Sequence, residues 1–307
     1  SILPDPIAAA AAALAGGCVE ERKTLRGTML VLHADYFAAK ESLNRYILIT
    51  PEKKEITLHF AFGPGAAIIS GTEVEVNGWQ LGDDFILNGQ DPVAGRLGGM
   101  KVLRTPGNPP VLGDQKILVL LTNFQNASEP VLSKAQVEGA MDQFRLYTRE
   151  NSYQKAFTSG IFAPARGADV YGWYTLPVSH TCDFVTVGVE AMREANLRNP
   201  EIDFTAYSRL VFIAPFTCGW EGTANIDRGE FLTPDGTAMV ALALVDSSPR
   251  GIFFNVLAHE IGHGFGLHHD GMLNCGNAIW APAGCVDQQY DGVSTMGNRF
   301  GGYYGAL

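Results

Sequence analysis

Three histidines and one glutamate near the C-terminal end of the sequence are the residues best spaced for chemistry. His259, Glu260 and His263 lie in the apolar stretch 252–265, whose composition predicts a helix. Residues four apart share one face of a helix, so the two histidines can direct their imidazole nitrogens at one metal ion. Glu260 then projects beside that ion, where it can accept a proton from water without being a ligand.

A third histidine, His269, lies ten residues after the first, too far to be reached along a continuous helix. The chain must turn back, and Gly266 can adopt the positive φ that such a turn needs. Three protein ligands leave the fourth position of a tetrahedral ion open, as catalytic Zn²⁺ requires. The probability that the pattern HExxHxxGxxH occurs by chance in a chain of this length is on the order of 1 in 10^5. We therefore predict a catalytic zinc ion held by His259, His263 and His269.

The two polar neighbours of His269 have open roles. His268 would point away from the ion, which is typical of a supporting or surface histidine. Asp270 either orients His269 through a hydrogen bond to its second ring nitrogen or is a simple solvated acid. His33 and His59 fall in predicted strands and are assigned no role.

The zinc motif, residues 259–269, followed by a downstream methionine resembles the metzincin peptidases. Residues 294–297 (STMG) are similar to the methionine turn of that family, with Met296 27 residues after His269. The resemblance implies that Met296 forms an apolar floor under the three histidines. It also implies an α+β fold, in which a mixed twisted sheet carries an active-site helix. The substrate peptide would be added along an edge strand of that sheet.

Among metzincins the chain is most similar to the gametolysin-type metallopeptidases. The supporting stretches are residues 172–177 (GWYTLP), 218–220 (CGW), the zinc motif and Met296 with Gly297. That family also carries a small β-domain before the catalytic domain, which residues 25–88 resemble. Because His269 and Asp270 are also similar to the snake-venom and disintegrin-type metzincins, the subfamily stays open.

The C-terminal end departs from the metzincin pattern. Eleven residues follow Met296, whereas metzincin domains continue into a helix in the region that carries the wall of the S1′ pocket. Either that helix is missing from the sequence, so that the catalytic domain is truncated at its C-terminus, or the domain is short.

The rest of the chain predicts two domains. Residues 1–24 form an N-terminal segment with a short alanine-rich helix. Short alternating strands in 25–89 predict a small antiparallel barrel or sandwich, and the Gly/Pro-rich stretch 90–113 reads as a linker. Residues 114–307 alternate apolar strands, such as 116–121 (KILVLL), with amphipathic helices, which favours a mixed catalytic domain.

The composition limits the classes of partner that can be expected. The net charge is −10 and no Lys/Arg-rich run stands out, so nucleic acid and acidic membrane surfaces are not expected partners. No apolar run is long enough to span a bilayer. The expected partner is a protein or peptide substrate, with cell-wall polymer or glycan contact through the β-domain as an additional role.

The five cysteines are spread along the sequence and form no CxxC pair. We predict the disulfides Cys275–Cys285 and Cys182–Cys218, and hence a secreted protein; the alternative is five inert buried thiols in a cytosolic protein. Cys18 is left over. It lies upstream of the catalytic domain, as the inhibitory cysteine of many metzincin pro-segments does, and its thiolate could take the position of the catalytic water. The alternative is a free or buried cysteine that ends the alanine-rich helix.

Together, these residues and the roles assigned to them predict a secreted zinc endopeptidase. Zinc would lower the pKa of a water molecule and polarise the scissile carbonyl. Glu260 would take the proton and deliver it to the leaving amine. Two alternatives stay open: a latent precursor in which residues 1 to about 100 block the cleft, and a β-domain that acts as a polymer- or glycan-binding module.

Overall fold

The computed structural model divides into two units, which are Ser1–Leu32 with Asn44–Gly107 and His33–Leu43 with Asn108–Leu307. Within the described residues the fold is α+β, with a large mixed sheet and three α-helices. The expected alanine-rich helix and Cys18 lie outside those residues. The structure describes residues 21–37, 39, 41–60, 68–87, 99–107, 110–127, 132–247, 253–270, 272–275, 285–288, 294–297 and 304.

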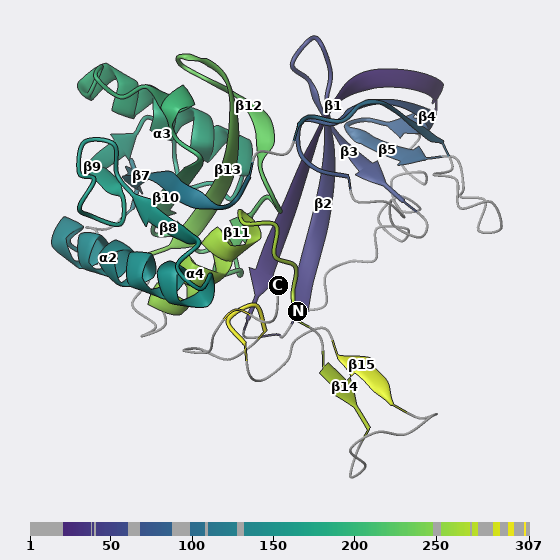
Figure 1. The fold of residues 1–307 in the computed structure, drawn as a ribbon. Helices are drawn as coiled ribbons and strands as arrows, with labels where there is room; N and C mark the ends of the chain where they lie inside the picture. Colours follow the sequence, from purple (N-terminus) through teal and green to yellow (C-terminus); the bar gives the residue numbers. More distant parts are fainter. Residues whose placement is uncertain are drawn as a thin grey trace. The chain divides into compact units, whose positions relative to one another are not determined.

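The first unit is built from strands whose pairings close a ring. β1 pairs with β2, and the ring continues through β3, β5 and β4 back to β1 (Figure 1). Buried apolar side chains such as Val74 and Val76 alternate with outward-facing glutamates on β4, which gives the ring an apolar core. The strands are β1 (Glu21–Tyr36), β2 (Glu41–Ile49), β3 (Glu55–His59), β4 (Glu73–Leu81), β5 (Asp84–Leu87) and β6 (Met100–Arg104). The end of β1 (residues 33–36) and the start of β2 (residues 41–43) belong to the second unit.

Two features of this unit differ from the sequence prediction. β3 and β5 pair in parallel. β4, which lies between them in the sequence, runs antiparallel to β5. β6 lies in the stretch expected to be a linker, yet it pairs with β4. The side chain of Met100 is buried among the core residues of the unit, which explains why this segment is held as a strand.

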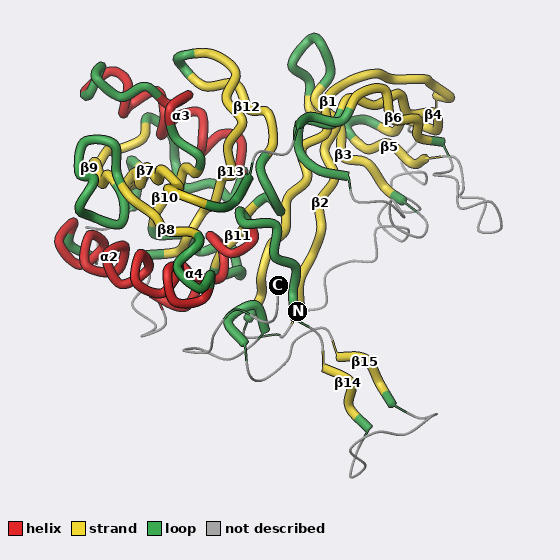
Figure 2. The backbone as a smooth tube through the Cα atoms, viewed as in Figure 1, coloured by secondary structure: helices red, strands yellow, loops and turns green. Residues whose placement is uncertain are grey.

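The second unit contains a mixed sheet in the order β11, β13, β10, β7, β9. β7, β10 and β13 are parallel and lie side by side (Figure 2). The predicted strand at 116–121 is part of β7, and residues 117–121 are fully buried on both faces. β11 runs antiparallel to β13. The strands are β7 (Gly113–Phe124), β8 (Ala156–Ser159), β9 (Asp169–Leu176), β10 (Arg209–Ala214), β11 (Gly222–Ala224), β12 (Gly229–Thr233) and β13 (Gly236–Asp246).

Helices cover both faces of this sheet, with α2 and α4 on one side and α3 on the other (Figure 1). α2 begins at a capping box, in which Ser133 and Gln136 satisfy each other's backbone N–H groups. α3 begins where the Asp183 side chain accepts from the N–H of Thr186. The helices are α2 (Lys134–Asn151), α3 (Phe184–Arg198) and α4 (Phe253–His263), with a short 3-10 helix, η1 (Phe204–Ala206).

Both predicted disulfides are confirmed, since Cys182 is bonded to Cys218 and Cys275 to Cys285. The second joins the ends of a two-stranded ladder of β14 (Met272–Asn274) and β15 (Val286–Gln288). No helix in the described part of the chain has both the length and the apolarity needed to cross a bilayer.

Candidate metal centre

The three histidines of the zinc motif converge in the structure. His259 and His263 are buried on α4, which ends at His263. Gly266 then takes φ +84°, and its N–H donates to the carbonyl of His263 at 2.8 Å, so the chain turns back as predicted. This turn brings His269 to the helix, and its Nε2 lies 3.1 Å from Nε2 of His259.

Backbone carbonyls fix the tautomers of the two helical histidines. Nδ1 of His259 lies 2.7 Å from the carbonyl oxygen of Thr295, and Nδ1 of His263 lies 2.8 Å from that of Leu267. A carbonyl can only accept, so each Nδ1 carries the proton and each Nε2 offers a lone pair. This is the arrangement in which metal-binding histidines are held.

A carboxylate from the N-terminal part of the chain lies among these nitrogens. Asp35, near the end of β1, is fully buried. Its Oδ2 lies 3.3 Å from Nε2 of His263 and 3.5 Å from Nε2 of His259. Its Oδ1 lies 2.7 Å from Nε2 of His269. The three histidines of the motif and Asp35 all belong to the second unit.

His33 of β1 and Phe37, which directly follows β1, also lie at the cluster. Nε2 of His33 lies 3.2 Å from Nε2 of His269. The ring of Phe37 meets the ring of His259 edge to face, with centroids 4.8 Å apart. The sequence analysis assigned no role to His33 and did not consider Asp35. The available signal was their spacing, because residues two apart in a strand share one face.

These residues fit a zinc ion. Burial lowers the pKa of His263 to about 3 and lowers the pKa of His269, so both rings are neutral at pH 7. Burial raises the pKa of Asp35, but the four surrounding histidines lower it by more, so this carboxyl stays ionised. The cluster therefore gathers lone pairs and a negative charge, which call for a cation.

The spacing of the ligand atoms supports the same conclusion. A tetrahedral ion with ligands at about 2.0–2.1 Å separates its ligand atoms by about 3.3–3.4 Å. The separations of 3.1, 3.3 and 3.5 Å between Nε2 and Oδ2 atoms lie close to that value. These separations are compatible with a zinc ion, whereas the 2.7 Å between Oδ1 of Asp35 and Nε2 of His269 is shorter than the tetrahedral value.

Glu260 lies beside the cluster and is fully buried. Both of its carboxylate oxygens are buried and have no hydrogen-bond partner among the described residues. One of them lies within 4.8 Å of ligand atoms of His259 and Asp35. Burial, followed by the charges of Asp35 and Glu221, raises the pKa of Glu260 well above its ordinary value. A raised pKa brings a carboxylate closer to the range in which it can exchange protons near neutral pH.

Gly222 on β11 leaves the room that the Glu260 carboxylate occupies. A Cβ atom at this glycine would lie 2.2 Å from Oε1 of Glu260. The absence of a side chain at position 222 therefore lets the carboxylate lie directly against the strand.

Residues 294–297 form a turn under α4, closed by a bond from the N–H of Gly297 to the carbonyl of Ser294. Thr295 supplies the carbonyl that fixes His259, and its hydroxyl lies 2.6 Å from the hydroxyl of Tyr147. The Met296 side chain is buried against Gly262, in the helical turn between His259 and His263. This is where the metzincin resemblance expects the methionine.

Close packing at Gly262 leads to a stability prediction. A Cβ there would lie 2.6 Å from Sδ of Met296 and 2.9 Å from a ring carbon of Tyr304. Gly262→Ala is therefore expected to lower the free energy of unfolding by about 1–3 kcal/mol. Gly139→Ala is the matched control on α2, where nothing lies within 4 Å of the added atom, and it should stabilise by about 0.5–1 kcal/mol. Urea unfolding measures both, and equal stabilities of the two variants would contradict the packing described.

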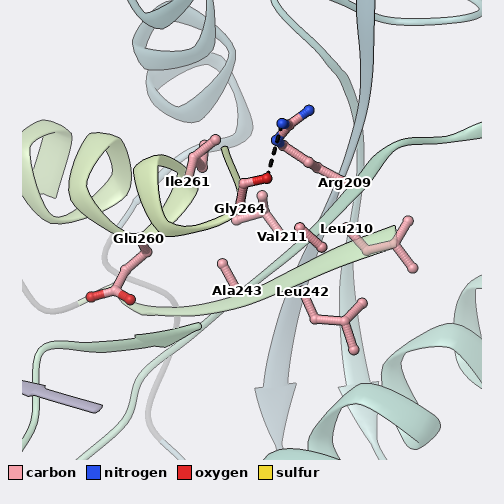
Figure 3. Close-up of a pocket in the computed structure, with 9 residues that line it drawn as sticks. Arg209, Leu210, Val211, Leu242, Ala243, Glu260, Ile261 and Gly264 are labelled. Atoms are coloured by element: carbon pink, nitrogen blue, oxygen red, sulfur yellow. Dashed lines mark hydrogen bonds between the residues drawn. The ribbon is translucent and has the colours of Figure 1, made fainter. Parts of the chain in front are cut away.

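Arg209, at the start of β10, contacts the turn that follows α4. It is fully buried, its Nη2 donates to the carbonyl of Gly264 at 3.0 Å, and its guanidinium lies 3.6 Å from the ring centre of Phe265. Figure 3 shows this bond and shows Glu260 pointing away from Arg209. The cavity between them has about 10 Å³, room for about one water molecule, so it is too small for a substrate.

His268 and Asp270, the polar neighbours of His269 in the sequence, do not join the cluster. His268 is exposed, as expected of a surface residue. The backbone N–H of Asp270 donates to the carbonyl of Met296 at 3.2 Å. Its Oδ2 is buried and has no hydrogen-bond partner in the described part of the chain, so an orienting contact through that oxygen is not seen.

Comparison with known proteins does not supply a family. No model of a known protein family matches the chain, and no curated protein matches its sequence. The case for a function therefore comes from the geometry of the cluster.

Proposed function

We propose that this chain is a secreted zinc endopeptidase of the metzincin type, most similar to the gametolysin-type enzymes, acting on extracellular or cell-wall proteins. One observation carries the proposal. The Nε2 lone pairs of His259 and His263 converge with His269 beside a buried carboxylate, Glu260, that has no partner among the described residues. A structural ion would not need this unpartnered carboxylate, whereas hydrolysis needs a base at this position.

The residues divide the reaction between them. Zinc, when bound, supplies a Lewis acid that activates water and stabilises the oxyanion. Glu260 accepts the proton of the attacking water and delivers it to the leaving amine. The carbonyls of Thr295 and Leu267 keep two of the histidines in the required tautomer.

β11 is the strand best placed to receive an extended peptide. It contacts the zinc helix α4, and one of its sides is paired with β13. Its other side is paired with β1 in this structure, and the Glu260 carboxylate lies against the face of β11 at Gly222. A peptide added to that side would place its backbone beside the metal ligands, in the strand-addition mode.

The two disulfides support secretion, because such bonds persist in oxidising compartments. A polymer- or glycan-binding role for the first unit stays a prediction.

Cleavage of a mixed peptide library tests the proposal. The zinc-loaded full chain and its Asp35→Ala variant are each incubated with the library, with and without a zinc chelator. We expect at least one of the two proteins to cleave peptides, and the chelator to abolish the cleavage. One bound zinc ion per chain without cleavage by either protein would contradict the peptidase assignment.

A further inference from the structure

We propose that Asp35 is a fourth protein ligand of the zinc ion and that the end of β1 fills the position of the substrate strand, so that the full chain is held inhibited. This inference rests on the proposed zinc-peptidase function. It assigns a role to residues for which the zinc motif provides none.

The first support is the position of the carboxylate. Asp35 reaches all three histidines of the motif, with oxygen-to-nitrogen distances of 2.7 to 3.5 Å. Three imidazoles leave one corner of a tetrahedral ion open, and this corner is where a catalytic water must bind. A carboxylate is a good zinc ligand, and here it stands at that corner.

The second support is the strand pairing. β1 pairs antiparallel with β11, with His33 opposite Ala224 and Asp35 opposite Gly222. The N–H of Glu221 donates to the carbonyl of Asp35 at 3.1 Å. The hydroxyl of Thr223 also donates to the carbonyl of His33, at 2.7 Å. β1 therefore uses the side of β11 that the proposed function assigns to substrate.

The third support is the alternation along β1. His33, Asp35 and Phe37 are two residues apart and all face the cluster. The ring of His33 lies 4.4 Å from that of His269, and the ring of Phe37 lies 4.8 Å from that of His259. Asp35, Glu260 and His263 are each 0% exposed. Consequently a peptide can reach the base and the ligands only after β1 has moved away.

This arrangement also bears on Cys18, the candidate inhibitory thiol. Cys18 lies outside the described residues. With Asp35 at the fourth corner, a tetrahedral ion has no position left for a thiolate. The inhibitory ligand is therefore assigned to Asp35.

Cobalt substitution tests the proposal without relying on activity. Co²⁺ is placed in the full chain and in its Asp35→Asn and Asp35→Ala variants, and each is titrated with acetohydroxamate while the visible spectrum is recorded. Asp83→Asn, which changes an exposed acid in the β4–β5 turn, is the matched control. Circular dichroism checks folding. If Asp35→Ala does not fold, the comparison is made with the isosteric Asp35→Asn variant alone.

We expect acetohydroxamate to bind the Asp35 variants at least about 100-fold more tightly than the parent and the control. The reason is that acetohydroxamate binds only the fraction of molecules in which the fourth coordination position is open. Removing the carboxylate opens that position in all molecules. The Co²⁺ spectrum should also change between the parent and the Asp35 variants. Equal hydroxamate affinity and equal spectra in all four proteins would overturn the role of Asp35 and leave the zinc-peptidase proposal intact. Failure of every protein to bind Co²⁺ would overturn both.

Discussion

Glu260→Gln is expected to lower peptide hydrolysis by about 10^2–10^4-fold while one zinc ion stays bound. The amide cannot accept the proton of the attacking water, and it is nearly isosteric with the carboxylate. Zinc stays bound because the ion is held by the histidines. The measurement is the cleavage rate and the zinc content of Asp35→Ala with and without Glu260→Gln, so that inhibition by β1 does not mask the effect.

A matched control for this change is Glu150→Gln, which alters an exposed glutamate near the end of α2. It should leave the cleavage rate unchanged. If Asp35→Ala with Glu260→Gln retained most of the cleavage rate of Asp35→Ala alone, Glu260 would not be the base. If it lost zinc, Glu260 would be a ligand.

His259→Ala and His263→Ala are each expected to weaken zinc binding by more than about 100-fold, because changes to the groups behind a ligand already cost about 10–100-fold. Each substitution removes a buried nitrogen and also leaves the carbonyl of Thr295 or Leu267 without its imidazole partner. Competition with a chromophoric chelator measures the affinity. His268→Ala is the control, since this exposed neighbour of the cluster should not alter binding.

His269→Ala gives a sharper comparison, because His33 lies close to the same position. Nε2 of His33 is 3.2 Å from Nε2 of His269. We expect His269→Ala to lower zinc affinity and His33→Ala to change it little. The reverse ranking would show that His33, from β1, supplies the third nitrogen in the full chain.

The parts of the site that could be predicted from the sequence depend on local spacing. The helical period places His259 and His263 on one face, and a glycine able to take a positive φ allows His269 to return. Cys275 and Cys285 are also close in the sequence, and their bond is confirmed.

The parts that could not be predicted depend on contacts between distant segments. Asp35 reaches the histidine cluster through the pairing of β1 with β11, and no periodicity in the sequence indicates that pairing. β11 has only three residues, too few to give an alternating pattern. Arg209 begins an apolar strand, and only the folded chain shows that Gly264 and Phe265 meet its guanidinium.

X-ray absorption at the zinc edge of the zinc-loaded full chain tests the central claim most directly. The account predicts at least three imidazole ligands and one carboxylate oxygen, with nitrogen and oxygen at about 2.0–2.1 Å and no sulfur. Asp35→Ala should lose the carboxylate and keep the imidazoles. A zinc–sulfur distance of about 2.3 Å would instead make a cysteine the inhibitory ligand, and fewer than three imidazoles would contradict the metal centre itself.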